Sequence, residues 1–140
     1  IAQNLFDALP IFRKRVLHLD TIQRDYHIPL SHVQVLALLH DNGSLSVSEI
    51  SKRLGIAKPN ITPLVDRLIH DGLVERQRDE KDRRVVNIRI CPDGVEKLSA
   101  IRMTLVEQVD DWSGDFSRSE LKELNKSLGC IIRILGSLKD

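Results

Sequence analysis

Five polar residues share one face of a segment near the middle of the chain: Lys58, Asn60, Thr62, Asp66 and Arg67. An asparagine can pair with adenine in the major groove of DNA, and threonine or lysine can meet phosphates or base edges. On an isolated helix, however, such residues are more often an ordinary solvent-facing surface. Whether they form a DNA-reading face therefore depends on the elements around them.

A second group of charges follows in the fully charged run at residues 79–84, where Arg83 and Arg84 stand beside Asp82. An arginine at the tip of a hairpin can enter a narrow minor groove, where the negative potential of DNA is deepest. Asp82 would repel phosphate if it faced outward, so we expect it to accept a hydrogen bond from an arginine and fix its direction. The alternative is a solvated turn with mutual salt bridges.

The first polar group lies in the second of two helices joined by a tight turn. Ser46 and Glu49 form a capping box that opens the first helix, and Gly55 ends it. Pro59 occupies the first turn of the second helix, where its missing N–H costs little, and residues 71–72 stop that helix. Its expected apolar face is Ile61, Leu64, Val65, Leu68 and Ile69. This order is the helix-turn-helix pattern.

Pro63 lies inside the second helix, where it removes a backbone hydrogen bond and crowds the preceding turn. One interpretation is a tolerated kink. The other is a device that sets the angle at which the first turn of the helix enters the groove.

The charged run lies between two expected strands. Residues 73–78 and 86–90 alternate between apolar and polar, which is the period of a strand with one buried face. A hairpin with a charged tip directly after a helix-turn-helix is a wing. In this context the DNA-reading interpretation of the polar face is favoured.

Amphipathic helices are expected before this motif. The apolar positions of the N-terminal stretch recur at spacings of three and four, at Leu5, Leu9, Phe12, Val16 and Leu19. Pro10 can bend this helix. The next helix is expected to open on a capping box of Ser31 and Gln34 and to end at residues 42–43. Its expected buried face is Val33, Leu36, Ala37 and His40.

Two more helices are expected after the motif. Pro92 starts the first, with a stripe of Val95, Leu98, Leu105, Val109 and Trp112, and a capping box of Ser117 and Glu120 opens the second. The second carries Leu121, Leu124, Leu128, Ile131, Leu135 and Leu138. An amphipathic terminal helix with no partner in its own chain implies a partner in another chain. The expected dimer interface is Leu5, Phe12, Leu121, Leu124, Leu128, Ile131 and Leu135.

The composition bounds the class of protein. The 140 residues carry a net charge of +1, but residues 52–89 hold ten Lys and Arg against six Asp and Glu, and such a local basic excess suits a nucleic-acid surface. The sequence has no membrane-spanning apolar run and no secretory signal pattern, so a cytoplasmic location is expected. Cys91 and Cys130 are expected to be buried apolar residues rather than a disulfide framework.

The segment from Leu45 to Cys91 resembles the winged helix-turn-helix of the MarR family of transcription regulators. The matching stretches are 45–50, 54–55, 65–68, 71–76 and the Asp-x-Arg wing motif at 82–84. Residues 92–94 are similar to the Thr-Pro-x-Gly helix opening of the family, with Cys91 in place of Thr. The resemblance implies a mainly α fold with a small β-hairpin wing. Its expected parts are an N-terminal arm helix (1–28), the winged helix-turn-helix (29–91) and C-terminal arm helices (92–140).

The resemblance further implies a homodimer on a pseudo-palindromic double-stranded DNA site, with recognition helices in two successive major grooves and wings in the flanking minor grooves. It makes Arg84 the minor-groove arginine and Asp82 its orienting partner. The expected DNA contacts are Ser46, Lys58, Pro59, Asn60, Thr62, Pro63, Arg67, Arg78, Asp82, Arg83 and Arg84. Residues 62–64 resemble the organic-hydroperoxide-sensing branch, but that branch senses through a cysteine near its N-terminus, and none precedes Cys91 here.

Members of the family often bind small phenolic or other aromatic acids between the arm and the DNA-binding domain, so a repressor released by such an effector is expected. The expected pocket residues are Phe12, Arg15, His18, His32 and Trp112.

We expect no enzymatic activity, cofactor or metal. The five histidines are scattered, and a zinc-responsive regulator using His27 and His32 near the Pro29 turn is a minor alternative, as is a redox-responsive one. A winged helix that binds protein rather than DNA is the other alternative. Such a module has no need for the charged triplet at residues 82–84.

Overall fold

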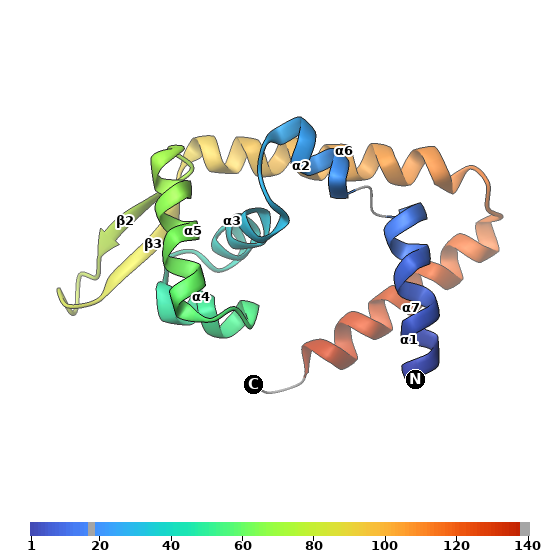
Figure 1. The fold of residues 1–140 in the computed structure, drawn as a ribbon, viewed down its shortest axis with the longest axis horizontal. Coiled ribbons are helices and arrows are strands. Elements are labelled where there is room, and N and C mark those ends of the chain that lie inside the picture. The colour runs from blue at the N-terminus through green and yellow to red at the C-terminus, as the bar shows by residue number, and fades with distance from the viewer. Residues whose placement is uncertain (17–18, 138–140) are drawn as a thin grey trace. The chain divides into compact units, whose positions relative to one another are not determined.

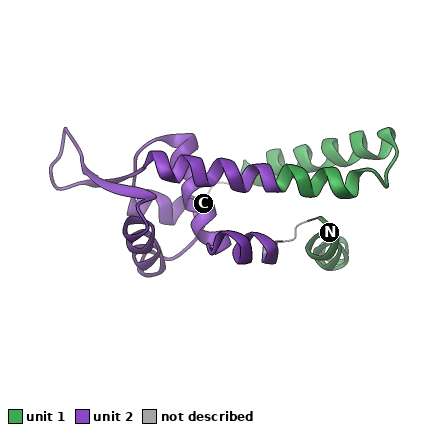
Figure 2. Ribbon diagram, turned by 90° about the horizontal axis from the view of Figure 1, so that it is seen from above, with its two compact units in different colours: residues 1–18, 105–140 green, residues 19–104 purple. Residues whose placement is uncertain are grey.

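The computed structural model of the chain describes residues 1–16 and 19–137 (Figure 1). The chain forms two compact units (Figure 2): residues 1–18 with 105–140, called the arm unit here, and residues 19–104, called the winged unit. No helix in the described part is long and apolar enough to cross a membrane.

The winged unit contains five elements before its β-hairpin, then the two strands of the hairpin, and then the first part of a long helix. The elements are α2 (Leu19–Tyr26), α3 (Leu30–Asn42), β1 (Leu45–Ser46), α4 (Val47–Leu54), α5 (Lys58–His70), β2 (Val74–Arg78), β3 (Val86–Ile90) and α6 (Pro92–Ser113). The strands form an antiparallel sheet in the order β1-β3-β2. The predicted mainly helical fold with a hairpin wing is therefore confirmed. The two-residue β1 was not predicted, because it is too short to show an alternating pattern.

The core of the winged unit is aliphatic, as the low aromatic content requires. Its fully buried side chains include Val35, Leu36 and Leu39 of α3, Ile50 of α4, Ile61, Val65 and Leu68 of α5, Val74 and Ile88 of the hairpin, and Leu98 and Ile101 of α6. Every element that carries the proposed DNA contacts therefore places apolar residues in this core. That packing fixes which side chains each element leaves exposed.

Three of the predicted turns have the expected backbone. The glycines that follow α3 and α4, Gly43 and Gly55, have φ angles of 74° and 63°, and Gly72 after α5 has 72°. Glycine adopts these positive values without the steric penalty that a side chain would bring.

The predicted start of α3 was wrong. The helix begins at Leu30 with Pro29 as its N-cap and no side-chain cap, so Ser31 and Gln34 form no capping box. The carbonyl of Pro29 accepts the N–H groups of His32 and Val33, at 3.0 and 3.2 Å. Because the fixed φ of proline already suits a helix entry, the backbone of Pro29 starts the helix two residues earlier than a cap at Ser31 would.

The predicted buried face of α3 was also rotated. Val35, Leu36 and Leu39 are buried, whereas His40 is exposed, and its Nδ1 lies 3.1 Å from Oδ1 of Asp41. Because α3 contacts α2, α4, α5 and β3, its buried surface is wider than the single stripe that the sequence pattern indicated.

The arm unit contains α1 (Ala2–Ile11), a π-helical turn (Phe12–Val16), the end of α6 and α7 (Arg118–Gly136). The N-terminal stretch is thus not one continuous α-helix. Pro10 has no N–H and crowds the preceding turn, and the widened turn begins two residues after it. His18, which was placed in the effector pocket, and Leu138, which was placed on the C-terminal apolar stripe, lie outside the described residues.

The capping box at the start of α7 was predicted correctly. Ser117 Oγ accepts the N–H of Glu120 at 3.3 Å, and the carboxylate of Glu120 accepts the N–H of Ser117 at 2.8 Å. The Ser117 hydroxyl also donates to the Glu120 carboxylate at 2.7 Å. This bond, and next the one from the Ser117 N–H, lower the pKa of Glu120, because they stabilise its ionised form.

Gly94 lies in the first turn of α6, where the helix packs closely against the hairpin. A Cβ atom on Gly94 would collide with the carbonyl oxygen of Leu73 and lie 2.8 Å from Cγ1 of Ile90. The same carbonyl accepts the N–H of Cys91 at 2.9 Å, so it is held in place. Only a residue without a side chain fits here.

We therefore expect Gly94→Ala to destabilise the protein by at least about 1–3 kcal/mol, the usual cost of overpacking a rigid site. Urea unfolding followed by circular dichroism measures the change. The matched control is Gly114→Ala, where no atom lies within 4 Å of the added Cβ. Equal stability of the Gly94→Ala and Gly114→Ala variants would contradict this account of the packing.

Candidate nucleic-acid interface

The exposed side of α5 is the centre of the candidate interface. Ile61, Leu64, Val65 and Leu68 are buried, and this packing turns the opposite side of the helix outward. The exposed residues are Lys58, Pro59, Asn60, Thr62, Pro63, Asp66, Arg67 and His70. The predicted polar face is therefore one continuous exposed surface.

Hydrogen bonds hold both ends of α4, the helix that precedes the turn into α5. Ser46 Oγ accepts the N–H of Glu49 at 3.2 Å, and the carboxylate of Glu49 accepts the N–H of Ser46 at 2.7 Å, which confirms the predicted capping box. These bonds lower the pKa of Glu49. After Gly55, Ser51 Oγ donates to the carbonyl of Ile56 at 2.6 Å.

Two charged residues of α5 are already paired within the winged unit. Asp66 accepts a hydrogen bond from Arg76 of β2, and Arg67 Nε lies 3.1 Å from Asp71 Oδ2. The carboxylate of Asp66 is therefore neutralised rather than presented to an anionic partner. α5 continues as an α-helix through Pro63, and the hydroxyl of Thr62 donates to the carbonyl of Lys58 at 3.3 Å.

The hairpin of β2 and β3 is the wing, and Figure 1 shows it beside α5. Within its loop, Asp82 Oδ1 accepts the backbone N–H of Arg84 at 3.0 Å and the side-chain Nε–H at 3.3 Å. Asp82 therefore orients Arg84 as predicted. The side chain of Arg84 is 92% exposed, so this pair holds the arginine while leaving it open to a partner.

Asp79 organises the same loop, a role that the sequence analysis missed. Its carboxylate accepts the N–H groups of Lys81 and Asp82, at 2.8 and 3.4 Å, and the Asn87 amide at 3.3 Å. The hydrogen bonds lower the pKa of Asp79. The sequence feature that indicates this role is an aspartate at the start of a turn, because its carboxylate often accepts the backbone N–H of the residue two positions later. Arg78 and Arg83, on either side of Asp79, are exposed.

The predicted effector residues fall in different places. Phe12 and Trp112 line one cavity of about 660 Å3 in the arm unit, with Leu105, Leu121, Leu124 and Leu128. Trp112 Nε1 is buried and has no hydrogen-bond partner among the described residues. Arg15 is exposed and does not line this cavity, and His18 is outside the described residues.

His32 lies on α3 in the winged unit, half-buried. Burial is the main cause of its lowered pKa, the charge of Asp71 opposes the shift, and that of Arg67 adds to it. Among the residues that the structure describes, no group of three His, Cys, Asp or Glu side chains could hold a metal ion.

The cysteines are less buried than predicted. Cys91 and Cys130 are both half-buried free thiols. Burial, and next the charge of Glu75, raise the pKa of Cys91, so its thiol stays protonated and unreactive at neutral pH.

The predicted dimer-interface residues divide into two sets. Phe12, Leu121, Leu124 and Leu128 are half-buried and line the arm cavity, whereas Leu5, Ile131 and Leu135 are 57%, 50% and 59% exposed. Neither α1 nor α7 contains a single buried residue. The arm unit therefore leaves much of its apolar surface in contact with solvent.

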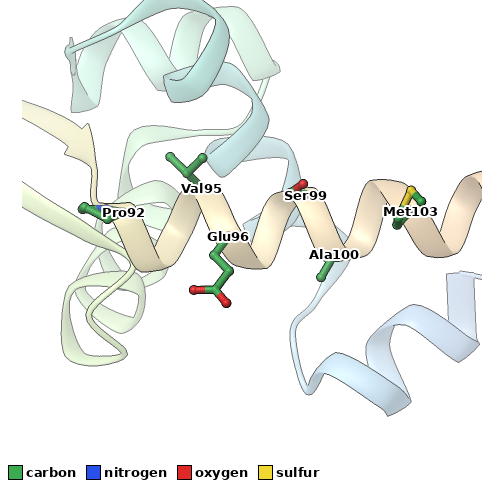
Figure 3. A pocket seen from close by; sticks show the side chains of 6 residues that line it. All are labelled: Pro92, Val95, Glu96, Ser99, Ala100 and Met103. Carbon is green, nitrogen blue, oxygen red and sulfur yellow. The ribbon is translucent and has the colours of Figure 1, made fainter.

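A further hollow of about 740 Å3 runs along α6 in the winged unit (Figure 3). All six residues that line it come from this one helix: Pro92, Val95, Glu96, Ser99, Ala100 and Met103. It carries a carboxylate and no cationic side chain, so it does not suit a nucleic-acid phosphate.

Comparisons with known proteins agree with this geometry. The model of the MarR family matches residues 28–86. The uncharacterized HTH-type transcriptional regulator YsmB of Bacillus subtilis is 32% identical over 93 residues, which are 66% of this chain and 64% of YsmB. The HTH-type transcriptional regulator MgrA of Staphylococcus aureus is 28% identical over 119 residues, covering 84% of this chain and 78% of MgrA. The aligned region thus spans less than two thirds of the length of YsmB.

A solved structure shows the same fold. Streptococcus pneumoniae FabT, solved in complex with DNA, has a TM-score of 0.79 and 22% identity, covering 99% of this chain and all of the FabT chain.

Proposed function

Because this chain belongs to the MarR family of transcriptional regulators, which are not enzymes, we propose that it binds a specific double-stranded DNA operator. The observation that carries the proposal is the pairing of an exposed polar helix face with a wing whose arginine is oriented by Asp82. α5 enters the major groove and Arg84 enters the flanking minor groove, where the negative potential is deepest. The structure of FabT, which has the same fold and was solved in complex with DNA, supports DNA binding by this fold.

The residues of the proposed interface have three tasks. Asn60 and Thr62 read base edges near the start of α5, while Lys58, Arg67, Arg78 and Arg83 neutralise phosphates. Pro59 and Pro63 shape the α5 surface, Ser46 caps α4, and Asp82 directs Arg84.

We propose that the protein acts as a homodimer on a pseudo-palindromic site. The large apolar side chains that α1 and α7 leave exposed support this assembly, because contiguous exposed apolar surface usually marks an interface. A two-fold dimer presents two copies of α5, which fits a DNA site with matching half-sites.

We further propose that the protein is a repressor released by a small aromatic or phenolic acid. The arm cavity supports this, since its lining is mostly apolar and Trp112 Nε1 has no described hydrogen-bond partner. A carboxylate or phenol oxygen would accept that N–H, and the ring would contact Phe12.

The DNA-binding mode is tested with Arg84→Ala. An operator selected from random-sequence DNA should bind the wild type several orders of magnitude more tightly than random duplex in fluorescence anisotropy. Loss of the Arg84 contacts should weaken operator binding at least about tenfold, since hydrogen bonds between charged groups contribute about 1.5–3 kcal/mol. The melting temperature should not change, because this side chain is 92% exposed.

The control for this experiment is Arg24→Ala, which removes an exposed arginine of α2 whose one ion pair within the described part of the chain is with its neighbour Asp25. It should bind the operator like the wild type. If Arg84→Ala retained operator affinity within twofold, or lost no more than Arg24→Ala, the proposed role of the wing would be refuted.

The dimer is tested with Ile131→Asp. Ile131 is half-exposed in the single chain, so a carboxylate there can be solvated in a monomer but not inside an apolar interface. We expect a monomer by analytical ultracentrifugation and a large loss of operator affinity. Lys126→Asp, at an exposed polar position of α7, should remain dimeric. A monomeric Ile131→Asp variant that bound the operator at wild-type affinity would refute the dimer model.

The effector site is tested by fluorescence, because Trp112 is the only tryptophan. Titration with benzoate and hydroxybenzoates should change its emission saturably and release operator DNA, whereas acetate should do neither. Phe12→Ala should weaken the response, while Phe6→Ala, which alters a 75% exposed phenylalanine of α1, should not. An emission unaffected by every aromatic acid would count against this site.

A further inference from the structure

A hollow of about 430 Å3 lies in the winged unit where the start of α4, the exposed side of α5 and the base of the wing meet. We call it the wing-base hollow. The residues of its lining that matter here are Ser48, Lys58, Thr62, Arg84, Val85 and Val86. It brings together three elements that are separate in the sequence.

The hollow is rich in hydrogen-bond donors and lacks carboxylates among its lining residues. Ser46, which also lines it, is engaged in the α4 cap, and the Thr62 hydroxyl donates to the Lys58 carbonyl. The Ser48 hydroxyl and the Lys58 ammonium form no hydrogen bond or ion pair within residues 1–16 and 19–137. Two donors, one of them cationic, are thus available at one place.

Apolar groups alternate with these donors. Val85 and Val86 are 37% and 41% exposed. A surface that combines free donors with exposed valines matches a sugar–phosphate strand, which alternates charged phosphates with apolar faces of deoxyribose.

The proposed DNA-binding mode requires such a surface at this position. A backbone strand separates the major groove from the adjacent minor groove. If α5 occupies the first and the wing occupies the second, that strand must pass between α5 and the wing. The wing-base hollow lies in that space.

We propose that the wing-base hollow seats the sugar–phosphate strand between the two grooves, with Ser48 and Lys58 binding one phosphate of it. Val85 and Val86 pack against deoxyribose, and the side chain of Arg84 extends alongside the strand into the minor groove. Ser48 thereby becomes a positioning residue that sets the register of α5 on the DNA. This inference rests on the proposed DNA-binding function and adds to it the place where one backbone strand is held.

The test combines Ser48→Ala with a chemical change in the DNA. The probe is the selected operator duplex in which one phosphate of each half-site is replaced by a neutral methylphosphonate, and the replacement is moved along both strands. One position should cost the wild type about tenfold or more in affinity, since a hydrogen bond to a charged group is among the stronger contacts. Ser48→Ala should bind the unmodified duplex about tenfold more weakly than the wild type does. The methylphosphonate at that one position should then lower the affinity of Ser48→Ala by less than a further twofold, because both changes remove the same contact.

Two further variants separate this contact from general effects. Lys58→Ala should lower the slope of log affinity against log salt by about 0.9 for each half-site, whereas Ser48→Ala should leave the slope unchanged, because it removes no charge. Ser99→Ala, at an exposed serine of α6 in the same unit, should behave like the wild type. Unchanged melting temperatures would show that Ser48→Ala is folded.

Two results would overturn the inference alone: operator binding by Ser48→Ala within twofold of the wild type, or a Ser48→Ala loss that adds in full to the loss at every methylphosphonate position. In either case, selective binding of the operator by the wild type would still support the proposed function. A wild-type protein that selected no DNA sequence over random duplex would overturn the proposed function, and this inference with it.

Discussion

The burial of one face of α5 is the constraint on which the candidate site depends. Ile61, Val65 and Leu68 are completely buried, so α5 has no freedom to rotate about its axis. Because residues three and four positions apart share a helix face, fixing this face also fixes the outward direction of Asn60 and Thr62. The ion pair of Asp66 with Arg76 then ties the exposed side of α5 to β2, so the helix and the wing are held together on both sides.

Much of this arrangement could be predicted from the sequence, wherever local chemistry decides the structure. The capping boxes at Ser46 and Ser117 were recognisable because all their atoms lie within four residues, and the Asp82–Arg84 contact spans only two. The start of α3 was wrong for a related reason. Ser31 fits the capping pattern, but the carbonyl of Pro29 accepts the N–H groups of His32 and Val33 and so starts the helix before Ser31, which a pattern of side chains does not show.

The contacts that join distant segments were beyond prediction. Ser48 had no distinguishing neighbour in the sequence, and its proposed role arises because the fold brings Lys58 and the base of the wing next to it. The pairing of Asp66 with Arg76 was missed for the same reason, and it changes the charge that α5 presents. Gly94 is an intermediate case. It belongs to a recognisable helix opening, but only the position of the Leu73 carbonyl explains why a glycine is needed there.

The arm unit buries fewer of its own residues than the winged unit does, so contacts within the chain stabilise it less. α1 and α7 contain no buried residue, whereas each helix from α3 to α6 contributes at least one buried side chain to the winged unit. Under the proposed assembly, the free energy of folding of the arm comes largely from the partner, so its stability depends on protein concentration. Four residues that line the arm cavity, Phe12, Leu121, Leu124 and Leu128, are also proposed interface residues. A ligand contacting Trp112 would therefore act on the packing that holds the two copies together, and through it on the spacing of the two α5 helices on DNA.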